Sequence, residues 1–269
     1  MTRKFVRYKQ SVIGYYRSGS GPRPAICLHG FNESAQSFAA LENKNNRYSI
    51  LAIAAPFHEA TQWEQGLSYS PSDLHEIIII ILNAEGFPSK EPLTLIGFSL
   101  GGRMALSYYE QYPETIEQLM LIAPDGLKFN FWYWFAVHTS MGNRLFHFTM
   151  YHPDWFIRMA ALLSRLGIIN AGIKKFVTHY LHNDAVRSAL YKTWTAFRPF
   201  DPRIRKIKRK IIQYQTPIQL YFGKYDNVIP AARGFAFIKG VETCARMHVL
   251  QTGHRLLQAK EVQEALNGQ

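Results

Sequence analysis

The sequence is poor in cysteine and has no long apolar run, and each shortage excludes a class of protein. Two of the 269 residues are cysteine, Cys27 and Cys244, which is too few for a disulfide framework or a cysteine-based metal site. A membrane-spanning helix needs about 18 consecutive apolar residues, and no apolar run in this sequence approaches that length. The charged N-terminal residues lack the apolar segment of a secretion signal. We therefore expect a soluble, cytoplasmic protein with two buried, unbridged thiols.

The histidines and acids show no metal-binding pattern. The chain has 10 histidines, but none has a second ligand at the spacing of a metal site. Its length suits one large domain or a domain with a sizeable insertion, and 47% hydrophobic residues can form a full core. We expect no metal and no cofactor.

The most informative segment joins a strand pattern directly to a helix pattern. Residues 93–96 form a buried apolar run, and Leu100, Met104 and Tyr108 then recur at helical spacing. The chain must turn sharply at Ser99. In the spacing Gly97-x-Ser99-x-Gly101, both glycines lie where strand and helix nearly touch, so that a Cβ would clash. Ser99 is then expected in a strained conformation with its hydroxyl exposed.

This turn resembles the nucleophile elbow of the α/β-hydrolase superfamily. A second interpretation makes Ser99 the N-cap of the following helix, with the glycines present only for close packing. The order of the other motifs favours the elbow. In the superfamily the nucleophile is followed by an acid and then by a histidine, and Ser99, Asp226 and His254 occur in that order. Asp226 follows the strand predicted at 218–222, and His254 follows the one at 247–250. Asp125, after the strand at 118–122, is the alternative acid.

The resemblance also assigns a loop that binds an oxyanion. His29-Gly30-Phe31 follows a strand at residues 25–28, where superfamily members carry a His-Gly pair. The amides of Phe31 and Leu100 would then be the two donors. His29 and Gly30 are expected beside the substrate.

One loop departs from the superfamily pattern. Relatives commonly carry Asp-x-Pro-Gly-x-Gly after the next strand, at 48–54, whereas residues 54–59 here are Ala-Ala-Pro-Phe-His-Glu. Two interpretations are open for His58 and Glu59: one of them faces the pocket, or both belong to a surface loop, which we favour.

The resemblance implies an α/β-hydrolase fold, with a mostly parallel, doubly wound sheet of eight strands and an inserted helical cap, and the alternation of strand and helix patterns is compatible with it. Residues 34–42 are expected to form the first crossover helix. Residues 77–81 are five isoleucines, which favour a strand. Ser70 and Pro71 before them and Gly86 after them are helix boundary signals, so we predict a helix over 71–84.

The strand and helix alternation stops for about 85 residues after Gly126. We assign residues 1–126 and 213–269 to the core and residues 127–212 to a helical cap, with helices over 155–166 and 173–181. The insert has 15 basic and three acidic residues, whereas the core has 16 of each. In the superfamily such a cap roofs the active site and contacts the substrate.

The resemblance implies a serine hydrolase that cleaves an ester or related acyl bond through an acyl-enzyme. Two alternatives stay open. The segment 97–103 is similar to the elbow of the menaquinone-pathway succinyl-hydroxy-cyclohexadiene-carboxylate synthase, a carbon–carbon lyase in which Arg103 would face an anionic substrate. A non-catalytic ligand-binding module is the other alternative. The presence of Ser99, Asp226 and His254 together argues against it.

The basic insert restricts the possible partners. A small acyl or anionic substrate fits its charge, and an anionic membrane surface fits the basic and aromatic residues around 129–135. We interpret the basic run at 203–210 as a solvated helix face or a linker back to the core, and we expect no nucleic acid. The oligomeric state is left open.

Overall fold

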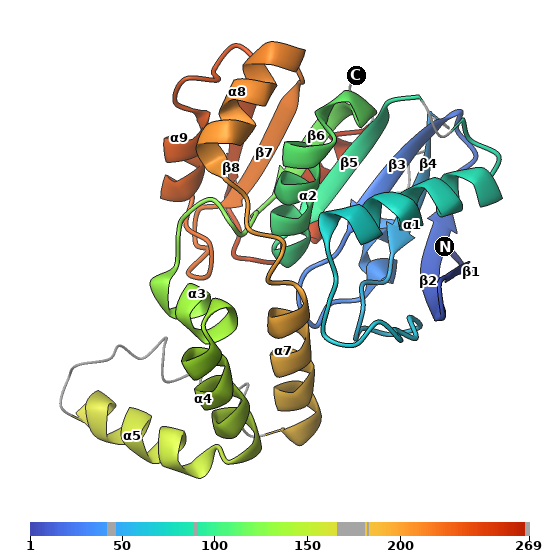
Figure 1. Ribbon diagram of the computed structural model, residues 1–269. Helices are drawn as coiled ribbons and strands as arrows, with labels where there is room; N and C mark the ends of the chain where they lie inside the picture. The colour runs from blue at the N-terminus through green and yellow to red at the C-terminus, as the bar shows by residue number, and fades with distance from the viewer. Residues whose placement is uncertain (42–46, 89–90, 166–180, 182, 267–269) are drawn as a thin grey trace. The chain divides into compact units, whose positions relative to one another are not determined.

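The computed structural model describes residues 1–41, 47–88, 91–165, 181 and 183–266. The chain divides into two compact units (Figure 1). Unit 1 comprises Met1–Lys128 and Pro199–Gln269, and unit 2 comprises Phe129–Arg198. Unit 1 contains the whole β-sheet, and the elements described in unit 2 are helices.

Unit 1 is built on an eight-stranded sheet with the order β1-β2-β4-β3-β5-β6-β7-β8 (Figure 1). β2 runs antiparallel to its neighbours β1 and β4, and the other neighbouring pairs are parallel. This arrangement confirms the predicted mostly parallel sheet. The strands are β1 Thr2–Tyr8, β2 Ser11–Ser18, β3 Arg23–Leu28, β4 Tyr48–Ile53, β5 Leu93–Phe98, β6 Ile116–Ile122, β7 Ile218–Gly223 and β8 Ala245–Leu250.

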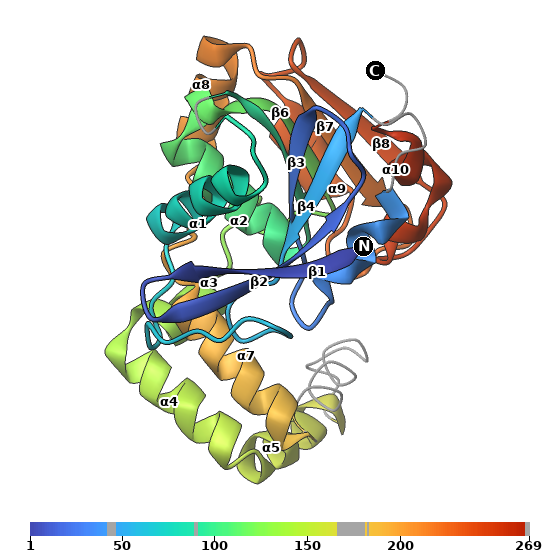
Figure 2. The same cartoon turned by 90° about the vertical axis from the view of Figure 1, so that its right-hand side faces the viewer.

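Helices cover both faces of this sheet. Helices α1, α2, α8 and α9 lie on one face, where Lys208 of α8 donates to the Ala236 carbonyl of α9, and α10 and the short helix η1 lie on the other (Figure 2). Every residue of β4 and β5 is buried, as expected for central strands covered on both faces. The helical elements are η1 Ala35–Leu41, α1 Pro71–Ala84, α2 Leu100–Gln111, η2 Pro113–Thr115, α8 Ile204–Tyr214, α9 Ala232–Ile238, η3 Leu256–Gln258 and α10 Lys260–Glu264.

Helix α1 forms despite its run of isoleucines. Ser70 is the N-cap: its hydroxyl accepts from the Asp73 amide, and the Asp73 carboxylate accepts from the Ser70 amide. Ile77, Ile78 and Ile81 are buried. The capping signals and this burial outweigh the strand propensity of the β-branched residues, and the predicted helix is confirmed.

The first crossover differs from the predicted helix over residues 34–42. It is a 3₁₀ helix, η1, and its buried residues are Ala35, Phe38 and Leu41. These positions are three residues apart, which matches the three residues per turn of a 3₁₀ helix. A 3₁₀ helix places residues at this spacing on one side, so that all three can be buried together.

Helix α8 belongs to unit 1, although the sequence prediction placed residues 127–212 in one insert. Ile207 and Ile211 are buried, and α8 packs against α2 and η2. The Arg203 amide and guanidinium both donate to the Glu110 carboxylate. The basic run at 203–210 is therefore on the sheet unit. Residues 129–198 retain eight basic and two acidic residues, so unit 2 carries half of the charge excess.

Unit 2 contains helices that begin at clear capping residues. Asn130, Thr139 and Asn183 each accept a backbone N–H at the start of a helix. Helix α4 packs against both α3 and α7. The helix over 154–165 confirms the one expected at 155–166, whereas nearly all of the segment 173–181 lies outside the described residues. The helices are α3 Phe131–His138, α4 Ser140–Tyr151, α5 Asp154–Arg165 and α7 Asp184–Ala196.

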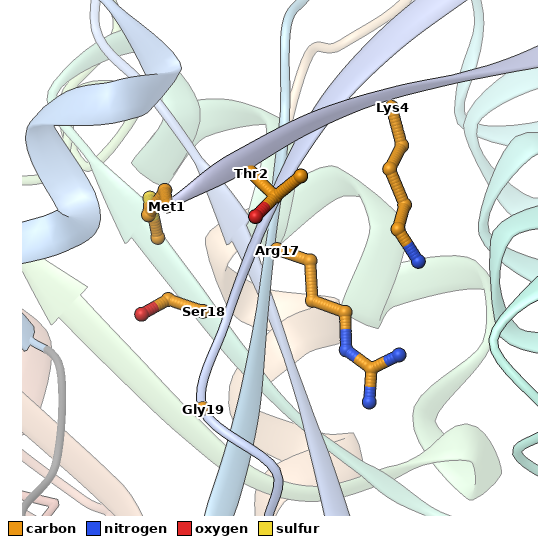
Figure 3. A pocket seen from close by; sticks show the side chains of 6 residues that line it. All are labelled: Met1, Thr2, Lys4, Arg17, Ser18 and Gly19. Atoms are coloured by element: carbon orange, nitrogen blue, oxygen red, sulfur yellow. The ribbon is translucent and has the colours of Figure 1, made fainter.

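A pocket of about 350 Å³ lies at the β1–β2 edge of the sheet. Lys4 and Arg17 line it, and their side chains extend in the same direction (Figure 3). Both cations contact the carboxylate of Glu85, with Lys4 Nζ 2.9 Å from its Oε1. The strand order separates β2 from β5 by two strands, so this pocket does not adjoin Ser99.

Candidate functional site

Ser99 is the single residue between β5 and α2. Its backbone has φ 51° and ψ −114°, a conformation that residues other than glycine rarely adopt. Neighbouring backbone holds it there. The Ser99 amide donates to the Ile122 carbonyl at 3.0 Å, and the Ser99 carbonyl accepts from the Asp125 amide at 2.9 Å. The strained turn is therefore anchored to the end of β6, and the predicted conformation of Ser99 is confirmed.

The glycines around Ser99 are required by the close approach of backbone. A Cβ on Gly97 would lie 2.5 Å from the Gly101 carbonyl oxygen, and a Cβ on Gly101 would lie 1.8 Å from the Leu28 carbonyl oxygen. Gly102 has the same constraint, because its Cβ would lie 2.6 Å from Pro124. The start of α2 thus packs against the ends of β3 and β5 with no room for side chains. The steric explanation of the spacing is confirmed, and it extends to a third glycine.

The hydroxyl of Ser99 does not cap α2. It makes no capping hydrogen bond with any residue that the structure describes. Its Oγ instead lies 3.2 Å from His254 Nε2. Ser99 therefore occupies the N-cap position of α2, but its side chain does not have the capping role of the second interpretation.

The structure brings Ser99, His254 and Asp226 into one hydrogen-bonded series. His254 Nδ1 lies 2.7 Å from Asp226 Oδ2, on the side of the imidazole away from Ser99. Asp226 lies on the loop after β7 and His254 on the loop after β8. These strands are parallel neighbours, so their carboxyl ends reach the same edge of the sheet as the end of β5.

The two loops that carry Asp226 and His254 touch through their backbones. A Cβ on Gly223 would lie 2.3 Å from the Gly253 carbonyl oxygen and 2.6 Å from that of Thr252. The Tyr225 amide donates to the Thr252 carbonyl at 3.0 Å. Glycine at position 223 is what allows this contact, which fixes the acid relative to the imidazole.

The Asp226 carboxylate is buried, and both of its oxygens accept hydrogen bonds. Its side chain is 0% exposed, and its Oδ1 accepts from the amides of Val228 and Ile229 at 2.7 and 2.9 Å. Burial raises the pKa of Asp226, but the hydrogen bonds from His254 and from the Ile229 and Val228 amides outweigh it, so the pKa lies below its usual value. Asp226 is therefore a carboxylate at neutral pH. It can hold the His254 ring in one orientation and stabilise its positive charge.

Asp125, the alternative acid, has a different partner. Its Oδ2 lies 3.0 Å from Arg103 Nε and 2.9 Å from Arg103 Nη2. The geometry places Asp226 beside the imidazole and Asp125 in this ion pair. Arg103 was expected to face a substrate, but its residue is 5% exposed and its guanidinium is bound to Asp125.

Gly30 lies directly beside Ser99. A Cβ on Gly30 would lie 3.2 Å from the Ser99 Cβ and 3.3 Å from the Phe98 ring. The loop after β3 therefore adjoins the serine. Leu100 is the first residue of α2, and the first amides of a helix have no acceptor within that helix. The assignment of the Phe31 and Leu100 amides as oxyanion donors stays a prediction.

His29 is buried and binds backbone on both sides of its ring. The residue is 1% exposed, its Nε2 accepts from the Ala55 amide at 3.0 Å, and its Nδ1 lies 2.8 Å from the Gly30 carbonyl oxygen. Nδ1 must therefore carry the proton. Burial, with a smaller contribution from the nearby His58, lowers the pKa of His29 to about 3. The expected substrate contact of His29 is not supported, because both nitrogens already hold the loop.

His58 has a structural role that the sequence interpretation missed. It was assigned to a surface loop, yet it is 8% exposed. The Asn32 amide donates to its Nε2 at 3.1 Å, and its ring meets those of His29 and Phe31 at centroid distances of 4.9 and 5.8 Å. Burial lowers its pKa. The available signal was topological, since β3 and β4 are parallel neighbours whose following loops must meet.

Other sequence predictions concern metals, thiols and membrane spans. Within the described ranges, no three His, Cys, Asp or Glu side chains converge on a point that could hold a metal ion. Both cysteines are free; Cys27 is buried as predicted, whereas Cys244 is partly exposed. Among the described helices, none is both long and apolar enough to cross a membrane.

The pKa of His29 predicts an acid-sensitive fold. The unfolded chain protonates this histidine near pH 6.5, whereas the folded chain does so near pH 3. Between these values the unfolded state binds more protons, so the free energy of unfolding falls as the pH falls, by about 1.4 kcal/mol per pH unit. His29→Gln retains a donor and an acceptor but does not titrate. Denaturant unfolding between pH 6 and pH 4 should show a slope smaller by about this amount.

A matched variant separates this effect from a general loss of stability. His152→Gln makes the same replacement of a histidine at an exposed position and is the control for that replacement. The test reads the slope, so a lower stability of His29→Gln at every pH does not affect it. Equal slopes in His29→Gln and the parent chain would contradict the assignment.

Comparison with known sequences gives a consistent family. A family model described as the alpha/beta hydrolase fold matches residues 24–216. The chain is 23% identical to "Uncharacterized hydrolase YugF" of Bacillus subtilis over 262 residues, covering 94% of this chain and 90% of the relative. It is 19% identical to human "Monoacylglycerol lipase ABHD6" over 270 residues, covering 94% of this chain and 77% of the relative.

A shorter match and a solved structure complete the comparison. Over 125 residues the chain is 32% identical to "Putative 2-succinyl-6-hydroxy-2,4-cyclohexadiene-1-carboxylate synthase" of Bacillus subtilis, which covers 43% of each chain. A thermophilic esterase from Thermogutta terrifontis superposes with a TM-score of 0.67 at 15% identity, covering 99% of this chain and 97% of the esterase. This likeness concerns the fold. The family match, the sheet order and the turn at Ser99 agree, and the chain belongs to the α/β-hydrolase fold family.

Proposed function

We propose that the protein is a serine hydrolase that cleaves an ester or a related acyl bond through an acyl-enzyme on Ser99. The observation that carries this proposal is the hydrogen-bonded series from Ser99 Oγ through His254 to Asp226. The strained turn at Ser99 adds support, because such a conformation has a structural cost and is found where function requires it. The substrate is a small molecule with an acyl group.

The first half of the reaction forms the acyl-enzyme. A serine hydroxyl is a weak nucleophile at neutral pH, so His254 Nε2 takes the Oγ proton as Oγ attacks the carbonyl carbon of the substrate. The carbonyl oxygen becomes an oxyanion. When the tetrahedral intermediate collapses, the bond to the leaving group breaks, and His254 returns the proton to that group.

The second half repeats these steps with water. His254 takes a proton from a water molecule, which attacks the acyl carbon. Collapse of the second intermediate breaks the bond to Ser99 Oγ, and His254 returns the proton to Oγ. The free acid leaves, and the enzyme is restored. Asp226 remains ionised throughout and stabilises the imidazolium that forms twice in each cycle.

The amides of Phe31 and Leu100 are the proposed oxyanion donors. Gly30 brings the loop after β3 against Ser99, and Leu100 follows Ser99 directly. Loss of one such donor typically costs about 3 kcal/mol in the barrier. His29 and His58 act behind this loop: His29 holds the Gly30 carbonyl and the Ala55 amide, and His58 holds the Asn32 amide.

A carbon–carbon lyase is the second candidate, because the chain is 32% identical to the putative synthase over 125 residues. That reaction uses a similar elbow and an anionic substrate. The role of Arg103 in binding such a substrate has little support, since Arg103 is 5% exposed and paired with Asp125. The likeness to the monoacylglycerol lipase favours acyl hydrolysis.

Turnover of a panel of esters tests the proposal. p-Nitrophenyl esters of increasing acyl length should be hydrolysed, with a burst of nitrophenol if deacylation is slow. Ser99→Ala should lower kcat by about 10⁴-fold or more. Ser107→Ala is the matched control on the same helix, because its buried Oγ has no hydrogen-bond partner among the described residues. Release of pyruvate from the synthase substrate without ester turnover would favour the lyase instead.

A second pair of variants tests the acid. Asp226→Asn should lower kcat by about 10⁴-fold, as removal of the equivalent charge does in serine proteases, because it favours the wrong histidine tautomer. Asp125→Asn breaks the pair with Arg103 and should lower thermal stability, while kcat of the folded fraction changes by less than about tenfold. Circular dichroism of both variants defines the folded fraction. A larger loss of kcat in Asp125→Asn would identify Asp125 as the acid.

A further inference from the structure

We propose that unit 2 docks on an anionic lipid surface through the exposed apolar side chains of α3 and α4. We define this docking face by six residues: Phe131, Trp132, Trp134, Met141, Leu145 and Phe148. The inference does not depend on the proposed catalytic chemistry. It concerns a surface that the hydrolase reaction leaves unexplained.

The part of the docking face on α3 is an aromatic cluster in solvent. Phe131 is 53% exposed and Trp132 is 75% exposed. Their rings lie 5.4 Å apart, and Phe131 also contacts the rings of Trp134 and Phe135 at 6.3 Å. Large rings that contact one another and remain exposed mark an interaction surface.

The part on α4 has the spacing of a core-facing stripe but faces solvent. Met141, Leu145 and Phe148 recur at i, i+4 and i+7 and are 70%, 47% and 51% exposed. The opposite side of α4 is occupied, since Thr149 and Met150 are buried and α4 packs against α3 and α7. Helix α4 therefore has one apolar side inside the unit and a second one outside it.

Helix α5 repeats the pattern. Trp155, Met159 and Leu162 have the same i, i+4, i+7 spacing and are 36%, 38% and 57% exposed. Three successive helices thus present apolar side chains to solvent. A single exposed apolar residue is ordinary, but an aromatic cluster and two stripes at helical spacing in one unit are not.

The charge of unit 2 identifies the partner as an anionic lipid surface. Residues 129–198 contain eight basic and two acidic residues. Arg144 lies within the α4 stripe and Arg158 within the α5 stripe; both are exposed, and neither has an ion-pair partner among the described residues. Long basic side chains beside tryptophan and phenylalanine suit a bilayer interface, where rings enter the headgroup region and cations meet phosphates.

The same charge disfavours a second copy of the chain as the occupant. Self-association through the docking face would bring two surfaces of the same positive sign together. A neutral apolar partner would not use Arg144 and Arg158. An anionic bilayer satisfies both the apolar side chains and the charge.

Co-sedimentation with vesicles tests the proposal, using the whole 269-residue chain. The probes are vesicles of phosphatidylcholine with phosphatidylglycerol, and vesicles of phosphatidylcholine alone, at low salt and at physiological ionic strength. We expect binding to the anionic vesicles, weaker binding as salt increases, and little binding to phosphatidylcholine alone. Trp132 should show a blue shift of its emission on binding, measured against the Trp132→Phe variant.

The chain offers a closely matched pair of variants. Phe131 in unit 2 and Phe235 in unit 1 are both 53% exposed. Phe131→Ser should lower the vesicle partition coefficient at least fivefold, whereas Phe235→Ser should leave it unchanged. Arg144→Gln should lower it about fivefold, as expected for one cation beside an anionic surface. Lys206→Gln, at an exposed position on α8, is the charge control.

Each other result overturns the proposal. Equal losses in Phe131→Ser and Phe235→Ser, or a larger loss in Lys206→Gln than in Arg144→Gln, would place the contact elsewhere. No binding to anionic vesicles at low salt would exclude a lipid role. Equal binding to both vesicle types would remove the charge argument. A dimer in sedimentation velocity that Phe131→Ser dissociates, without vesicle binding, would make a second copy the occupant.

Discussion

The candidate site depends on one close contact between the start of α2 and the ends of β3 and β5. The Leu28 carbonyl oxygen lies where a Cβ of residue 101 would be, so the helix can approach the sheet only if that residue is glycine. This approach leaves a single residue, Ser99, to reverse the chain, and it forces φ to 51°. The strain is held by bonds from Ser99 to the end of β6. A larger residue at position 101 would move α2, and with it Ser99 and the Leu100 amide.

The loops around this contact are held by neutral imidazoles and by backbone contacts. His29 and His58 each accept an amide N–H, which requires an unprotonated nitrogen, and burial keeps both pKa values low. Across the site, Gly223 lets the loop of Asp226 lie against that of His254. The geometry of the site therefore depends on buried backbone and on the side chains of His29 and His58 as much as on the three residues in the hydrogen-bonded series.

Much of this arrangement could be predicted from the sequence because its signals are local. The glycine spacing around Ser99 and the boundary residues of α1 can each be interpreted from neighbouring residues alone. The parallel strand order then brings the loops after distant strands to one edge of the sheet. Long-range contacts carry no such signal. Nothing near Arg103 indicates that Asp125 neutralises it, and nothing near Ile207 indicates that α8 packs on unit 1. The buried position of His58 and the 3₁₀ form of η1 likewise depend on tertiary packing.

The central claim is that Ser99 is a nucleophile activated by His254, and covalent labelling tests it most directly. A fluorophosphonate probe reacts with activated serines, and peptide mapping by mass spectrometry locates the adduct. The account predicts one adduct, on Ser99, that is absent in Ser99→Ala and strongly reduced in His254→Ala, while both variants keep the parent circular dichroism spectrum. Labelling at another residue, or no labelling of the folded protein, would contradict it.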